Sequence, residues 1–185
     1  MGWHNSPKRY GLTAQLFHWV TLLLVVALFA LASYFEEMPA GPEKGVVIGW
    51  HKSIGITVML LTLLRLGWRL LDTAPPPVFA PTQWQQSLTL WTHRGLYLLL
   101  IVLPFSGYLM SLAAGRPVVL FNQIALPVLL GENKPLAEQL KELHEILATL
   151  LFLLVALHSA AALWHQFFLR DSLLSRMWPG GDDQA

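Results

Sequence analysis

Four long apolar runs dominate the hydrophobic pattern of the chain. They cover residues 12–34, 46–71, 88–112 and 141–169. A helix needs about 20 mainly apolar residues to cross the hydrocarbon core of a bilayer, and each run reaches that length. The pattern therefore predicts an all-α integral membrane protein, a four-helix bundle that forms a single membrane domain over residues 1–185.

The segments between the runs are polar or rich in proline. Residues 35–45 and 72–86 read as short crossings outside the membrane. The longest loop, residues 113–140, contains an apolar stretch that Pro127 interrupts and that is too short to span, so we expect it to lie on the membrane surface. The polar tail, residues 170–185, is expected to be disordered.

Composition excludes several kinds of chemistry. Hydrophobic residues make up 55% of the 185 residues and charged residues 12%, which is typical of a protein that lies in membrane lipid. The net charge of +1, without a cluster of Lys and Arg, argues against a nucleic-acid partner. There is no cysteine, so disulfides, thiolate metal sites, iron–sulfur clusters and covalently attached haem are excluded.

An even number of spans places both termini on one side of the membrane. More of the Lys and Arg residues fall on that side than on the other. Because cytoplasmic loops carry an excess of these residues, we expect both termini to be cytoplasmic.

Histidines inside the runs carry the functional argument. His144 and His158 are 14 residues apart in the fourth run, which on a helix means one face and about 21 Å along the axis. Successive helices cross the membrane in opposite directions. His51 therefore lies at the same depth as His144, near the face opposite the termini (the outer level), and His18 lies at the same depth as His158, nearer the face with the termini (the inner level). A b-type haem needs two neutral imidazoles that face each other across the porphyrin. A lone histidine that only hydrogen-bonds a neighbouring helix is the simpler alternative for each residue.

Small residues support the haem hypothesis. Gly55, Ala148 and Ala162 each follow a histidine by four positions, which leaves room for a flat macrocycle. Small residues also let two helices approach closely without a ligand. Zinc or copper on histidine remains an alternative, although the two pairs lie too far apart to share one ion.

Basic residues near the histidines suit the anionic propionates of haem. Arg65 and Arg69 share a helix face with His51 and end at the inner level, whereas Lys52 lies at the outer level. The alternative is that these side chains extend to the lipid headgroups.

Four motifs resemble the bacterial cytochrome b561 family, which is related to the cytochrome b subunits of hydrogenases and formate dehydrogenase. The resemblance covers nearly the whole chain. It implies a four-helix protein of the bacterial inner membrane with two b-type haems, whose axial iron ligands are His18, His51, His144 and His158. The motifs are RYG…FHW (9–19), WHKSIGI (50–56), HRGLYLLLIVLPFSGYLM (93–110) and LHEILA…LHSAAALWH (143–165).

The family includes a superoxide:ubiquinone oxidoreductase. By this resemblance His93 and His165 belong to a quinone site, although polar anchoring at the membrane surface is the alternative for both. The resemblance thus implies an enzyme that passes electrons from a donor on the periplasmic side, with superoxide as the first candidate, to ubiquinone. The alternative is an electron-transfer subunit whose loop 113–140 docks a periplasmic redox protein such as a hydrogenase.

Overall fold

Four long helices form an antiparallel bundle in the computed structural model, which describes residues 2–77, 82–171 and 173–178. The helices are α1 (Leu12–Glu37), α2 (Pro42–Leu71), α3 (Gln83–Ala113) and α4 (Lys134–Trp164). All four are long and apolar enough to cross a membrane. The predicted fold class, an all-α membrane four-helix bundle, is confirmed.

Three helices begin earlier than the apolar runs indicate. α4 begins at Lys134 rather than at residue 141, because the Asn133 side chain accepts the backbone N–H of Leu136 at 3.1 Å and caps the first turn. α3 begins at Gln83 rather than at residue 88, because Gln85 accepts the backbone N–H of Thr82. These first turns are polar, so hydropathy alone does not detect them.

One cluster of buried hydrophobic residues takes one residue from each helix. Val25, Val58, Leu100 and Leu151 are buried together at the centre of the bundle. The pairs α1–α2, α2–α3 and α3–α4 pack closely, whereas the backbones of α1 and α4 come less near to each other. Contact between α1 and α4 is made by side chains, for example by the rings of Phe29 and Phe152, whose centres are 5.6 Å apart.

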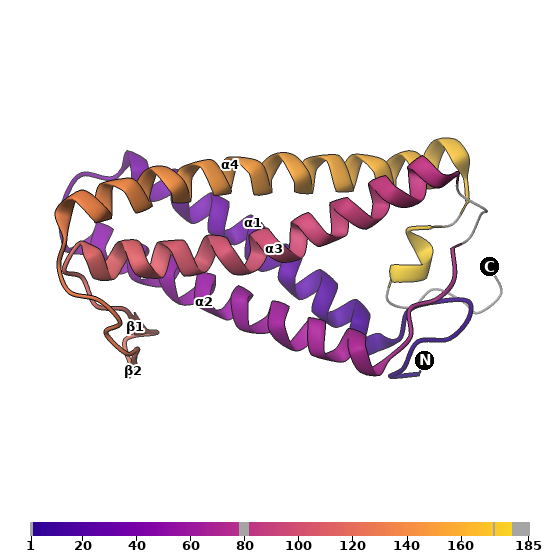
Figure 1. Cartoon of the computed structure of the whole chain (residues 1–185), viewed down its shortest axis with the longest axis horizontal. Helices are drawn as coiled ribbons and strands as arrows, with labels where there is room; N and C mark the ends of the chain where they lie inside the picture. The colour runs from indigo at the N-terminus through magenta and orange to yellow at the C-terminus, as the bar shows by residue number, and fades with distance from the viewer. Residues whose placement is uncertain (1, 78–81, 172, 179–185) are drawn as a thin grey trace.

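A small hairpin covers part of one end of the bundle; we call this end outer and the end with the chain termini inner, after the orientation that the sequence predicts. Its strands, β1 (Val119–Leu120) and β2 (Ile124–Ala125), pair antiparallel at the end of the molecule opposite the described chain termini (Figure 1). The backbone N–H of Phe121 donates to the hydroxyl of Ser53 at 2.9 Å, which ties the hairpin to α2. The hairpin therefore sits directly beside the helix that carries His51.

The C-terminal segment is more ordered than its composition indicates. After α4 the chain forms a π-helical turn, η1 (His165–Leu169), and then a 3-10 turn, η2 (Ser175–Met177). Trp19 donates its indole N–H to the carbonyl of Met177 at 2.8 Å and packs edge-on against Trp178. The prediction of a disordered tail is therefore wrong for residues 173–178, because their apolar side chains contact the inner end of the bundle. Residue 172 and residues 179–185 lie outside the described residues.

Candidate functional site

Two of the predicted histidines meet at the inner level of the bundle. The ring centres of His18 on α1 and His158 on α4 are 6.2 Å apart, and the ring planes are inclined by 63°. Two imidazoles that bind one metal ion at about 2.0 Å each have ring centres roughly 6 Å apart. The separation therefore suits two axial ligands of a single iron.

A third imidazole lies beside this pair. The ring of His93 on α3 packs edge-on against His158, with ring centres 5.4 Å apart. Nδ1 of His93 donates to the carbonyl of Thr89 at 2.7 Å, so in the neutral ring Nε2 keeps its lone pair. The structure thus places His93 next to the inner histidine pair, on the side of His158.

Arg65 contacts the inner pair directly. Its Nη2 lies 3.2 Å from Nδ1 of His18, and its guanidinium carbon lies 5.5 Å from the ring centre of Tyr97. A guanidinium only donates, so Nδ1 of His18 accepts in this arrangement and the ring proton is on Nε2. Iron binding through Nε2 needs the opposite tautomer. Ligation by His18 therefore requires Arg65 to exchange this contact for another acceptor.

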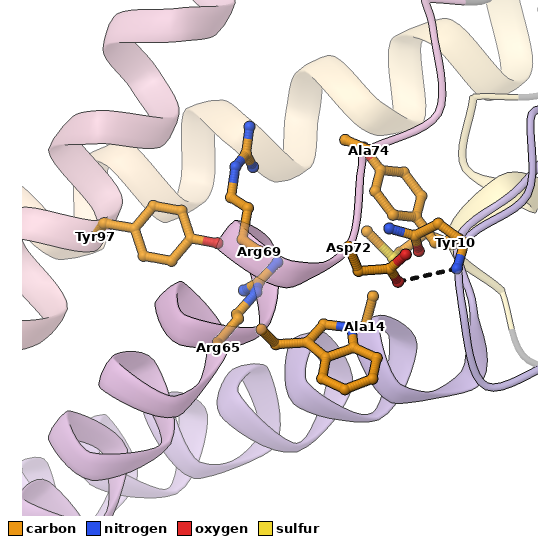
Figure 2. A pocket seen from close by; sticks show the side chains of 10 residues that line it. Tyr10, Ala14, Arg65, Arg69, Asp72, Ala74 and Tyr97 are labelled. Carbon is orange, nitrogen blue, oxygen red and sulfur yellow. Dashed lines mark hydrogen bonds between the residues drawn. The ribbon is translucent and has the colours of Figure 1, made fainter.

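A basic pocket adjoins this contact at the inner end. Figure 2 shows Arg65 and Arg69 extending from α2, with the ring of Tyr97 reaching toward them from α3. Tyr10 and Asp72 also line the pocket, and Asp72 accepts the backbone N–H of Asn5 at 2.9 Å. Two guanidinium groups and two phenol hydroxyls are a donor set suited to carboxylates such as haem propionates. Sequence reasoning had identified the arginines but not the tyrosines.

At the outer level, His144 on α4 is held by α3. Its Nδ1 donates to the carbonyl of Leu103 and lies equally close to the Ser106 hydroxyl, at 3.1 Å in each case. The ring also packs against Gly107, where an added Cβ would lie only 2.8 Å from Cε1 of His144. With its proton fixed on Nδ1, neutral His144 presents the lone pair of Nε2, which is the form that binds a metal.

His51 on α2 lies within electrostatic reach of His144. Its ring packs edge-on against Phe35, with ring centres 5.4 Å apart. The buried Nδ1 of His51 makes no hydrogen bond of standard geometry among the described residues, although the backbone of Leu28 on α1 lies close enough to the ring to act as an acceptor. If Nδ1 donates there, Nε2 keeps the lone pair that binds a metal, as it does in His144.

Lys52 points toward the outer loop. Its Nζ donates to the hydroxyl of Ser111 at 2.7 Å, and that hydroxyl donates to the carbonyl of Arg116. Lys52 and Arg116 lie within electrostatic reach of each other. The outer end therefore carries two neighbouring cations, with Lys52 already tied to α3.

His165 is placed differently from the other predicted site residues. It begins the π-helical turn η1, beyond the inner end of α4, and its Nδ1 forms a short contact with the carboxylate of Asp171. Asp171 carries no periodic signal in the sequence, because a π-helical turn and the residue after it break the helical repeat. Sequence reasoning missed this partner.

The donor set favours paired imidazoles over a conventional zinc site. Within the part of the chain that the structure describes, no three His, Asp or Glu side chains are grouped so that they could hold one metal ion. Structural zinc in proteins is bound by four ligands and catalytic zinc by three. Two imidazoles facing each other are instead the ligand set of a b-type haem, and the residues present fit that group.

Comparison with known proteins gives a consistent result. A family model described as prokaryotic cytochrome b561 matches residues 9–180. The chain is 33% identical over 184 residues to cytochrome b561 homolog 2 of Escherichia coli K12, covering 96% of this chain and 95% of that protein. It is 31% identical over 172 residues to a protein of Yersinia pestis named probable superoxide oxidase CybB, covering 93% of this chain and 97% of that protein.

Proposed function

Because the chain belongs to the prokaryotic cytochrome b561 family, and is thus a multi-pass membrane cytochrome of the b type, we propose that it binds two haems and passes electrons from a donor at its outer face to ubiquinone near its inner face. The observation that carries this proposal is the 6.2 Å separation of the His18 and His158 rings. The location proposed is the bacterial inner membrane with both termini in the cytoplasm, as the distribution of Lys and Arg indicates.

Each histidine pair has a defined part in this proposal. His18 and His158 would hold the inner iron, and His51 and His144 would hold the outer iron. His144 is oriented by its hydrogen bonds to Leu103 and Ser106, which keep Nε2 available. When bound, the haems supply one-electron redox chemistry, and the protein supplies their spacing, ligation and electrostatic surroundings.

Basic side chains at both levels would hold the propionates. With haem bound, Arg65 would exchange its contact with His18 for a propionate oxygen, in the pocket that Arg69, Tyr10 and Tyr97 also line. This exchange would also free Nδ1 of His18 to carry the ring proton that iron ligation requires. At the outer level Lys52 is the corresponding cation, tied to Ser111.

The quinone site is proposed at the inner end, with His93 and His165 as its polar side chains. His93 keeps a lone pair on Nε2, because Nδ1 is engaged by Thr89, and His165 is paired with Asp171. An imidazole at this surface exchanges protons with a quinone oxygen and with water at neutral pH. A site of this kind supplies the two protons that quinone reduction consumes.

Superoxide is the donor that we propose first. Two superoxide anions each lose one electron and leave as dioxygen, and one ubiquinone takes up the two electrons and two protons to become ubiquinol. One relative is named a probable superoxide oxidase. The cations Lys52 and Arg116 at the outer end favour the approach of a small anion.

The test uses the purified full chain in detergent or nanodiscs. We expect a pyridine haemochrome assay to give two haems b per chain, and superoxide generated enzymatically to drive ubiquinone reduction. Protein without haem, although its host is well supplied, would overturn the proposal. If quinone reduction instead requires an added periplasmic redox protein, that result would contradict the superoxide reaction and support the alternative, in which the protein is an electron-transfer subunit.

A further inference from the structure

The chain reverses direction just after α4 and returns to His165. The π-helical turn η1 ends at Leu169, and the next residue, Arg170, has a φ of 53°, in the left-handed region that residues other than glycine seldom adopt. The backbone N–H groups of Arg170 and Asp171 both point to the carbonyl of His165. π-helical turns and unusual backbone conformations occur preferentially at functional sites.

The result of this reversal is a fixed pair of side chains. One carboxylate oxygen of Asp171 contacts Nδ1 of His165, and the other accepts the backbone N–H of Leu173 at 3.1 Å. The carboxylate is therefore oriented from both sides. The side chains of His165 and Asp171 are only 20% and 16% exposed, so the pair is partly shielded but still open to the inner solution.

A carboxylate on Nδ1 decides which atom of an imidazole can react. It holds the ring proton on Nδ1, fixes the ring orientation, and stabilises the protonated ring when a second proton binds at Nε2. The atom that exchanges protons with a substrate is then Nε2. His165 and Asp171 form an arrangement of this kind at the end of the bundle that we assign to quinone.

We propose that Asp171 is the positioning residue of the quinone reaction and makes His165 the side chain that delivers a proton to the quinone. This inference rests on the proposed function. As the quinone is reduced, the Nε2–H bond of protonated His165 breaks and an O–H bond forms on a quinone oxygen. The ring then regains a proton from water at the inner face. Asp171 keeps its contacts with the ring of His165 and with the N–H of Leu173 and does not touch the quinone.

The variant that separates this role from a structural one is Asp171→Asn. The amide keeps an oxygen for the N–H of Leu173 and removes the negative charge beside Nδ1. Asp171→Glu keeps the charge and serves as the conservative rescue. Glu138→Gln, on an exposed position of α4 far from this turn, removes the same charge and is the matched control.

We expect Asp171→Asn to lower kcat for quinone reduction by about 10- to 100-fold, the scale of loss seen when the hydrogen-bond partner of a metal-binding histidine is removed. The KM for quinone, the haem content and the rate of haem reduction by the donor should stay at wild-type values. Asp171→Glu should recover most of kcat, and Glu138→Gln should resemble the wild type.

The inference alone is overturned if kcat and KM of Asp171→Asn both equal those of the wild type, or if kcat falls equally in Asp171→Asn and Asp171→Glu. A raised KM with unchanged kcat also overturns it, since that pattern indicates binding rather than proton transfer. A wild-type protein that holds haem but does not reduce quinone overturns the proposed function itself, and this inference with it.

Discussion

Arg65 donates a hydrogen bond to His18, with 3.2 Å between Nη2 and Nδ1. This contact joins two residues that the sequence suggested for different parts of one site, an axial ligand and a propionate partner. It also couples their roles, because a neutral His18 cannot both accept at Nδ1 and present a lone pair at Nε2. The position of Arg65 is therefore linked to ligation.

Replacing Arg65 by Gln should lower the reduction potential of the inner haem. Loss of a nearby positive charge stabilises the oxidised iron, by about 1 kcal/mol or roughly 40 mV for a one-electron couple. A redox titration followed at the haem absorption band measures this shift. Arg94→Gln is the control, because Arg94 is exposed and its guanidinium stacks over Trp91 instead. If the inner haem has the same reduction potential in Arg65→Gln and Arg94→Gln, Arg65 does not belong to the haem site.

Replacing His158 by Ala should remove the inner haem and leave the outer one. The remaining imidazole, His18, provides only one axial ligand, and a haem that is not covalently attached needs both to be held firmly. Haem per chain should fall by about half in a pyridine haemochrome assay. Leu157→Ala is the control, since the neighbouring Leu157 is 56% exposed on the surface of α4. Retention of two haems in the His158 variant would contradict the pairing.

Replacing Gly107 by Ala should affect the outer haem selectively. The added Cβ would lie 2.8 Å from Cε1 of His144, so the ring must move away from its hydrogen bonds to α3. We expect one of the two haems to be lost or to change its absorption spectrum. In Gly45→Ala, the control, the added Cβ meets no atom within 4 Å. Unchanged spectra in the Gly107 variant would show that His144 does not need this packing.

Replacing Arg176 by Ala should loosen the inner end of the molecule. Its guanidinium donates to the carbonyls of Lys8, Pro7 and Pro76, and so joins both chain ends to the segment after α2. Loss of these bonds costs about 1–3 kcal/mol locally. We expect faster trypsin cleavage near Lys8, with haem content preserved. Lys141→Ala, which removes only an exposed ion pair with Glu145, should not change that rate.

Hydropathy and histidine spacing together predicted much of this molecule. The four helices follow from the length of the apolar runs. The proximity of His18 and His158 follows from the 14-residue spacing of His144 and His158 together with the opposite directions of successive helices. The early start of α4 at Lys134 was missed, because its first turns are polar and capped by Asn133. The hydrophobic pattern gives no information on a helix cap that lies outside the apolar run.

Contacts made by irregular backbone were not predictable in the same way. The pairing of His165 with Asp171 depends on a π-helical turn and on a positive φ at Arg170, neither of which has a hydrophobic period. The packing of Gly107 against His144 depends on which face of α3 meets α4. Such features are set by tertiary packing and were visible only in the structure.

The low-temperature EPR spectrum of the oxidised, purified protein tests the central claim most directly, because it reports the axial ligands of ferric haem. Two histidine pairs predict two low-spin ferric signals of the bis-imidazole type. His144→Ala should remove one of them and leave the other. A spectrum dominated by high-spin iron, or a wild-type spectrum that survives both His144→Ala and His158→Ala, would contradict the account.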